Sequence, residues 1–172
     1  DGKVVTWGKG SGSLPAGHTP VEVTELDWAG GERAKQVMGP GVYGSIHILL
    51  EDGRIRAIDG HPYHSGHYYT GGPYVGNITS AIQIDNSSGA CYALQSDGSV
   101  YSWGYNSTEH FLGRTELAVS YGEGWTPGQV TGIGPGSGAI KICARNGGAM
   151  VLFEDGSVKA WGTNNNDLYK TG

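Results

Sequence analysis

The sequence is poor in positive charge and has no long apolar run. Of its 172 residues only 11 are lysine or arginine, against 16 aspartates and glutamates, and the net charge is -5. Nucleic-acid-binding domains carry a clustered basic patch or stripe, whereas the few basic residues here are scattered, so we expect no nucleic-acid partner. No apolar run approaches the ~18 residues that indicate a transmembrane helix, so we expect no membrane insertion.

Cysteine and the short motifs of common enzymes are also scarce. The chain has two cysteines, Cys91 and Cys143, and neither lies in a Cys-x-x-Cys pair, which argues against a structural zinc site. We interpret them as buried thiols on strands, because free cysteine is among the most buried residue types, although the sequence leaves a disulfide between them open. The G-x-S-x-G, H-E-x-x-H and P-loop patterns are missing, so we expect no enzyme and no cofactor.

Glycine, in contrast, is abundant. It accounts for 32 of the 172 residues, more than twice the usual ~7%, and seven prolines add further breaks. Such a composition is typical of many short strands joined by tight turns. It predicts an all-β fold.

An internal repeat is the strongest feature of the sequence. Four Asp-Gly pairs recur along the chain, at 1–2, 52–53, 97–98 and 155–156. A Trp-Gly pair follows in three of the four copies, whereas the second copy has Ile58 and Asp59 in that place. The tryptophans are Trp7, Trp103 and Trp161. We expect the large apolar ring of each tryptophan to cover a neighbouring unit.

Each Asp-Gly pair between two apolar runs predicts a β-hairpin, because glycine accepts the positive φ of a tight turn. The turn glycines are Gly53, Gly98 and Gly156. The strands before these turns read IHILLE, CYALQS and AMVLFE, and the strands after them read RIRAI, SVYSW and SVKAW. A single hairpin is marginally stable in water, so the units must stack, and radial stacking of small sheets gives a propeller.

The stretches ALQSDGSVYSWGYN and VLFEDGSVKAWGTNNNDLYKTG resemble the repeat of the regulator-of-chromosome-condensation family. The segments FLG at 111–113 and LYKTG at 168–172 match the end of that repeat, and TPGQVTGI at 126–133 and HTPVEV at 18–23 match the stretch that leads into the next blade. The resemblance covers most of the chain. It implies a β-propeller-like array of four-stranded antiparallel blades.

The chain also departs from the family's pattern. A histidine five residues before the Asp-Gly aspartate is present only as His47, and Tyr92 and Met150 replace it in later copies. The family's propeller usually has more blades than these repeats supply. We therefore expect residues 1–172 to form a single propeller-like repeat domain that is a segment of a larger propeller, or is completed by other copies or other chains of an assembly.

A histidine-rich loop is the most unusual local sequence. His61, His64 and His67 follow an H-x2-H-x2-H spacing, and imidazole is the commonest protein ligand of transition metals. Against a metal site, Pro62 and Gly66 interrupt the stretch, and regular spacing on a loop does not direct three nitrogens to one point. The alternative is a polar, aromatic surface loop.

The same loop is the best candidate for recognition. Tyrosine provides rigid amphipathic contact area, and binding surfaces are rich in it; the alternative is that these rings cover the second, tryptophan-poor unit. The candidate binding residues here, and in a second insertion, are Tyr63, His64, His67, Tyr68, Tyr69, Tyr74, Tyr121 and Trp125.

Three N-glycosylation sequons begin at Asn77, Asn86 and Asn106. The motif is short, and turn-rich chains produce it by chance, so the asparagines are either glycan acceptors or turn residues.

These observations lead to a hypothesis and two alternatives. The hypothesis is a non-enzymatic interaction or structural module that binds protein or glycan through inter-blade loops, in an extracellular, cell-surface or virion-surface assembly. The first alternative, implied by the family resemblance, is nucleotide exchange on a small GTPase. The second is a metal-binding surface module that uses the histidine loop.

Overall fold

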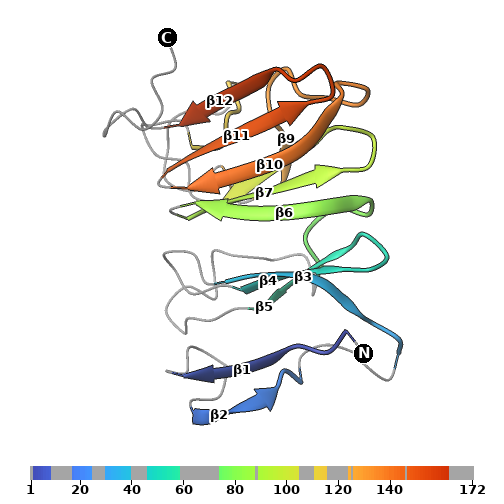
Figure 1. The fold of residues 1–172 in the computed structure, drawn as a ribbon, viewed down its shortest axis with the longest axis vertical. Helices are drawn as coiled ribbons and strands as arrows, with labels where there is room; N and C mark the ends of the chain where they lie inside the picture. The colour runs from blue at the N-terminus through green and yellow to red at the C-terminus, as the bar shows by residue number, and fades with distance from the viewer. Residues whose placement is uncertain are drawn as a thin grey trace.

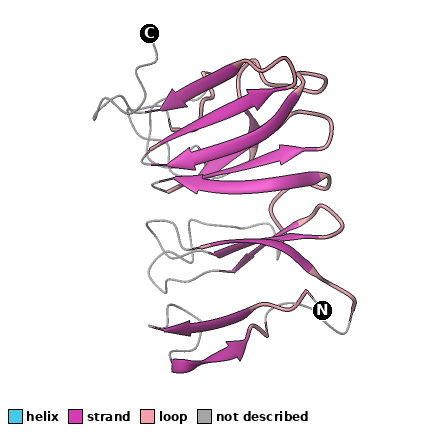
Figure 2. Ribbon diagram, in the orientation of Figure 1, coloured by secondary structure: helices cyan, strands magenta, loops and turns pink. Residues whose placement is uncertain are grey.

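The structure is a computed structural model, and it describes ten stretches of the chain with gaps between them. These are residues 2–8, 17–24, 30–39, 46–58, 74–87, 89–104, 111–115, 124, 126–145 and 147–162. Within these stretches the regular secondary structure consists of β-strands alone (Figure 2). In this part of the chain no helix is present that has the length and apolarity to cross a membrane. The all-β prediction is confirmed.

Twelve strands form four antiparallel sheets, stacked one upon another in chain order (Figure 1). Sheet 1 contains β1 (Val5–Gly8) and β2 (Gly17–Glu22). Sheet 2 contains β3 (Ala34–Met38), β4 (Ile46–Leu50) and β5 (Ile55–Ile58). Sheet 3 contains β6 (Ala81–Ser87), β7 (Ala90–Gln95), β8 (Val100–Gly104) and β9 (Gly128–Gln129). Sheet 4 contains β10 (Ala139–Arg145), β11 (Gly148–Phe153) and β12 (Val158–Gly162).

Within each sheet the strands follow their order in the chain, and the Asp-Gly pairs connect the second strand to the third. Gly53, Gly98 and Gly156 lie in these turns with φ of 84°, 84° and 83°, a backbone conformation that favours glycine. The first residue of each third strand pairs with a leucine of the second, as Val100 pairs with Leu94. The hairpin turn of sheet 2 is equivalent, although that unit lacks the Trp-Gly pair.

Among the described residues only sheet 3 has all four strands of the expected blade. In sheet 2 the fourth position is a single bridge between Arg56 and Tyr74. The two strands of sheet 1 correspond to the third and fourth strands of sheet 3, because the Val23 amide donates to the Val4 carbonyl as the Val130 amide donates to the Val100 carbonyl. Sheet 4 contains the first three strands.

The apolar core lies between the sheets. One cluster joins sheets 1 and 2 through Ile48 and Leu50, the next joins sheets 2 and 3 through Leu49, and the third joins sheets 3 and 4 through Leu94. Consecutive residues of one strand therefore face different neighbours, since side chains alternate across a strand. This explains why the second strands are almost continuously apolar and why all of β7 is buried.

The first strands of sheets 2, 3 and 4 are joined by side-chain amides. Gln36 on β3 donates to the Ile84 carbonyl at 2.7 Å and accepts from the Ile84 amide at 3.0 Å. Gln83 on β6 makes the same two bonds with Ile142, at 2.7 and 3.0 Å. Each glutamine thus binds the backbone of the next first strand as another strand would.

The expectation of two buried cysteines is half wrong. Cys91 on β7 is buried, whereas Cys143 on β10 is exposed, and both are free thiols. Cys143 pairs with Met150 on the neighbouring strand, at a position where the side chain faces solvent.

Candidate interaction surfaces

Two of the tryptophans pack against the sheet that precedes their own. Trp103 on β8 is 2% exposed; its Nε1 donates to His47 Nε2 on β4 at 3.3 Å, and the two rings meet edge to face with centroids 5.6 Å apart. Trp161 on β12 repeats the arrangement with sheet 3. Its Nε1 donates to the Phe111 carbonyl at 3.0 Å, and its ring lies 5.8 Å from that of Tyr92.

The glycine of the FLG segment is explained by the tryptophan of the next sheet. Gly113 has φ of +62°, and a Cβ added to it would lie 2.7 Å from the indole ring of Trp161. A side chain there would displace the ring. The segment that ends one repeat is therefore shaped by the repeat that follows it.

His47 and Cys91 lie together at the contact between sheets 2 and 3, with Sγ 3.8 Å from Nδ1. Burial lowers the pKa of His47 to about 4 and raises the pKa of Cys91 to about 12. Both groups are thus neutral near pH 7. Because Nε2 of His47 accepts the Trp103 proton, the imidazole proton is on Nδ1, which faces the sulfur.

Trp7 on β1 has no described sheet in front of it and is 64% exposed. Val5 is 47% exposed and points to the same side as Trp7, because residues two apart share one face of a strand. Val4, on the opposite side, packs on sheet 2. We call Val5 and Trp7 the N-terminal face. It is the end of the stack where the preceding sheet would lie.

The other end of the stack is open at β12. Val158 is 57% exposed, whereas Ile55 and Val100, its counterparts in sheets 2 and 3, are fully buried. An open hollow of about 500 Å³ lies on the opposite face of β12 from Val158, because Ser157 and Lys159 line it and side chains alternate along a strand. It is lined by residues of the β11–β12 hairpin, its turn included, and of the connector before β10, namely Gly132, Gly136, Ser137, Gly138, Phe153, Glu154, Asp155, Ser157 and Lys159. We call the free side of β12 at Val158 the C-terminal edge.

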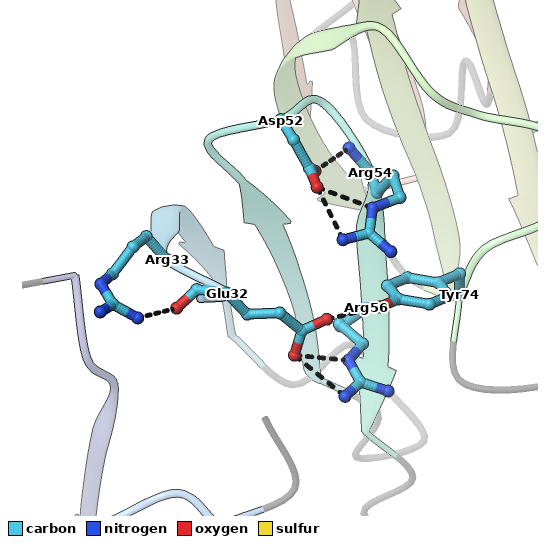
Figure 3. A network of polar contacts seen from close by, with 6 residues as sticks. All are labelled: Glu32, Arg33, Asp52, Arg54, Arg56 and Tyr74. Atoms are coloured by element: carbon cyan, nitrogen blue, oxygen red, sulfur yellow. Dashed lines mark hydrogen bonds and ion pairs between the residues drawn. The ribbon is translucent and has the colours of Figure 1, made fainter. Parts of the chain in front are cut away.

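A buried polar cluster ties the connector before β3 to sheet 2 (Figure 3). Glu32 is 7% exposed, and both of its carboxylate oxygens have partners. Oε2 accepts from Arg56 Nε at 3.2 Å and Nη2 at 3.0 Å, and Oε1 accepts from the Tyr74 hydroxyl at 2.6 Å. The bond to Glu32 raises the pKa of Tyr74.

The cluster gives Tyr74 a structural environment. The guanidinium of Arg54 lies 4.2 Å from the centroid of the Tyr74 ring, and that of Arg56 lies 4.9 Å from it. Arg54 also pairs with Asp52 at 2.7 Å and thereby lowers the pKa of that carboxyl. The ring of Tyr74 therefore contacts two guanidiniums, and its hydroxyl binds Glu32. These contacts are those of a residue that covers the second unit, which is the alternative to a role in recognition.

Comparison with solved structures identifies the architecture. The chain matches the structure of Kap60 bound to yeast RCC1 (Prp20) with a TM-score of 0.72 and 18% identity, over 95% of this chain and 38% of that one. It matches human WBSCR16 with a TM-score of 0.63 and 20% identity, over 95% of this chain and 44% of the other. A structure of Prp20p from Saccharomyces cerevisiae matches with a TM-score of 0.65 and 19% identity, over 95% and 40%.

The chain has the fold of part of an RCC1-type β-propeller. It spans about two fifths of the length of these structures, so the four sheets correspond to a run of consecutive blades. No family model matches the sequence, and no curated protein matches it.

Most of the predicted recognition residues, in the histidine- and tyrosine-rich loop and in the second insertion, lie outside the described residues of the RCC1-type propeller. This applies to Tyr63, His64, His67, Tyr68, Tyr69, Tyr121 and Trp125, and to His61 of the predicted metal site. In the described stretches no group of three or more histidine, cysteine, aspartate or glutamate side chains is placed to hold a metal ion. The histidine site therefore stays a prediction.

The sequons differ in their surroundings. Asn77 is exposed in a turn, and Asn106 lies outside the described residues. Asn86 is on β6, and its Nδ2, the atom that carries an N-linked glycan, donates to the Gly39 carbonyl at 3.0 Å. Of the two described candidates, Asn77 is exposed, whereas Asn86 is half-buried and its Nδ2 is engaged by the Gly39 carbonyl.

Several residues that join the blades were missed by sequence reasoning. Gln36 and Gln83 occupy the same position of successive repeats, two residues after an alanine, and that recurrence is a signal that could have found them. Glu32 has no counterpart in the other repeats, because the polar cluster occurs in one blade. No sequence signal distinguishes it from a surface acid.

Proposed function

We propose that this RCC1-type propeller segment is a non-enzymatic interaction and structural module, and that it binds protein through the open ends of its stack. The observation that carries the proposal is the contrast between Trp103, 2% exposed, and Trp7, 64% exposed. The two residues are equivalent in the repeat. Trp103 has a sheet of the preceding blade over it, so the surface that fits Trp7 is a further sheet of the same kind.

A second copy of the chain offers such a sheet. In sheet 4 Met150 occupies the repeat position of His47 and Tyr92, the residues on which Trp103 and Trp161 lie. Methionine packs well against aromatic rings. Trp7 of one copy would therefore pack on the Met150 side of another, a head-to-tail contact that joins copies into rings or open arrays.

Matched structures of the same fold include proteins described with protein partners, which supports a protein as the class of partner for this chain. The structure of Prp20p was described together with its binding to Gsp1p and histones, and another match is a complex with Kap60. Nucleotide exchange on a small GTPase has no specific observation here in its favour. Glycan binding by the loop that contains Tyr74, and an extracellular, cell-surface or virion-surface setting, stay proposals from the sequence.

Sedimentation equilibrium over a range of protein concentrations tests the proposal. We expect the solution mass to rise from 18.0 kDa to multiples of it. A Trp7→Lys variant should weaken the association at least ~10-fold, because a desolvated tryptophan at an interface is worth ~2 kcal/mol or more.

The matched control for Trp7→Lys is Ile82→Lys, since Ile82 is 41% exposed on β6, away from both ends. It should associate like the unchanged chain. A mass that stays at the monomer value at every concentration, or equal association by the Trp7→Lys variant, would contradict the proposal.

A further inference from the structure

The contact between sheets 2 and 3 contains a histidine where the next contact in the stack has a tyrosine. His47 on β4 is buried beneath Trp103 of sheet 3, and Tyr92 on β7, in the same repeat position, is buried beneath Trp161 of sheet 4. A phenol takes up no proton in acid, whereas an imidazole does. The two contacts should therefore respond differently to acid.

The surroundings of His47 offer nothing that would compensate a positive charge. Met38 and Ala57 pair with it on the neighbouring strands β3 and β5, and Cys91 and Trp103 face it from sheet 3. Of these four residues only Cys91 titrates, and burial raises the pKa of its thiol to about 12. No described carboxylate forms an ion pair with His47. A proton on this ring would thus be a buried charge without a partner, which is costly.

Protonation would also remove a hydrogen bond between the two sheets. A neutral imidazole has one acceptor nitrogen, and in His47 this is Nε2, which accepts from Trp103 Nε1 at 3.3 Å. A proton on Nε2 turns the acceptor into a donor, so that two N–H groups point at each other. The other ring nitrogen faces Cys91 Sγ at 3.8 Å. Separation of the ring from sheet 3 relieves this arrangement, because water can then accept both protons.

Other bonds across the two contacts differ as well. Both contacts have a glutamine bridge between first strands, but β6 binds sheet 4 with two more side chains. Asp85 and Ser87 accept from backbone amides of β10 and of the turn that follows it. The equivalent residues after the glutamine of β3 are Met38 and Pro40, whose side chains have no oxygen. The contact between sheets 2 and 3 therefore depends more on the histidine and its neighbours.

We infer that the contact between sheets 2 and 3 is an acid-sensitive hinge, which opens when His47 takes up a proton and divides the stack into sheets 1–2 and sheets 3–4. In the open form Trp103 has no sheet over it, as no described sheet lies over Trp7. The inference goes beyond the proposed function and does not depend on the partner of Trp7, because the hinge lies inside the stack. It makes the number of exposed faces of the module depend on pH.

Linkage between the proton and the opening gives the expected size of the effect. Opening returns His47 to water, where its pKa is 6.5, from about 4 in the closed contact. The closed form has its full advantage above pH 6.5 and loses it as the pH falls toward 4, by about tenfold for each pH unit between these values. We expect the open fraction to rise at least ~10-fold between pH 7 and pH 5.

The two cysteines of the chain provide the measurement, because Cys91 is buried at the hinge and Cys143 is exposed. Both thiols are labelled with dithiodipyridine, which reacts in acid as well as at neutral pH, and the two rates are followed by mass spectrometry of peptides. Cys143 corrects for the effect of pH on the reaction itself. The rate at Cys91 divided by the rate at Cys143 should rise at least ~10-fold between pH 7 and pH 5.

Replacement of the histidine should abolish the response. In the His47→Tyr chain the ratio of the two rates should change by less than about twofold, because a phenol takes up no proton in this range. His47→Met is a second variant, since Met150 occupies the same repeat position. No rise of the ratio in the unchanged chain, or an equal rise in either variant, would overturn the inference.

A matched control shows whether the opening is confined to one contact. Ala149 on β11 has the repeat position of Cys91, and it is fully buried at the contact between sheets 3 and 4. The double variant Ala149→Cys and Cys91→Ala moves the buried thiol to that contact. Its labelling relative to Cys143 should rise by less than about threefold between pH 7 and pH 5. A rise equal to that at Cys91 would mean that the whole fold opens in acid, which would also overturn the inference.

Discussion

At the scale of single residues, His47 is a titratable side chain that is held almost entirely away from water, with 4% of it exposed. It lies between two sheets, accepts the indole proton of Trp103, and faces the sulfur of Cys91. The other repeats place Tyr92 and Met150 at this position, so a ring or a thioether can serve there as well as an imidazole. What the position requires is a large side chain without charge, since a buried charge without a partner is costly.

The stability of the fold should therefore fall in mildly acidic solution. The pKa of His47 is about 4 in the folded chain and 6.5 without burial, so the unfolded chain binds one more proton between these values. The contribution of neutral His47 to the free energy of unfolding is fully present above pH 6.5 and is lost as the pH falls toward 4. The total loss is roughly 3 kcal/mol. Urea unfolding at a series of pH values measures it.

The control for this pH dependence is His47→Gln. The variant changes the absolute free energy of unfolding, but it should have a flatter dependence on pH between 4 and 6.5 than the unchanged chain. Equal slopes for the two proteins would show that His47 is not the group responsible.

At the scale of the strand, the contacts between neighbouring sheets depend on a few side chains that form hydrogen bonds with backbone groups, as a paired strand would. Gln83 satisfies the amide and the carbonyl of Ile142, a residue that is 1% exposed. Lys141, at the same position of β10, has no acceptor and cannot make the paired bonds. The series of glutamine bridges therefore ends at sheet 4.

Replacement of Gln83 by methionine should lower the free energy of unfolding by about 1–3 kcal/mol, because it leaves buried backbone groups of β10 without partners. Lys141→Met is the matched control, since Lys141 is exposed, and it should change the value by less than ~0.5 kcal/mol. Chemical denaturation of the two variants makes the comparison. Similar losses in both would mean that the bridge adds nothing beyond the packing of its side chain.

The hairpins could be predicted from sequence, and the fourth strands could not. Asp-Gly between apolar runs determines its turn locally, so the turn at Gly98 follows from its own neighbours. The strand β9 has two residues, Gly128 and Gln129, neither of which favours strands. It forms because β8 offers a free edge. In sheet 2 the same position is reduced to Tyr74, held by Glu32, and that contact is made between segments far apart in the chain.

At the scale of the whole molecule, each sheet contacts only the sheets before and after it. Sheet 3 is covered on both sides, whereas the outer side of sheet 1 is its exposed N-terminal face. In an array of this kind local stability follows the number of neighbours. The incomplete count of repeats predicted the open ends, but the particular residues that mark them, Trp7 and Val158, emerged from comparison of equivalent positions in space.

Amide hydrogen exchange should show a gradient of protection along the stack. We expect the slowest exchange in β7, where every residue is buried, and the fastest in β1 and β2, where most residues are exposed. Mass spectrometry of peptides from each sheet measures the gradient. Uniform protection from β1 to β12 would mean that the stack opens as one cooperative unit.

The reciprocal contacts between an Asp-Gly turn and the next connector have a consequence for the history of such chains. The Gly53 carbonyl accepts from the Ala81 amide as the Gly2 carbonyl accepts from the Ala34 amide, and at the next junction the Gly98 carbonyl accepts from the Ser137 hydroxyl. Sheet 2 is therefore joined to sheet 3 by the same backbone bond that joins sheet 1 to sheet 2. A gene segment that encodes sheet 2, duplicated in register, would give a unit whose turn-to-strand bond already exists on both sides. Blade number is thus a property that recombination can alter in whole steps, without a new interface having to arise at each one.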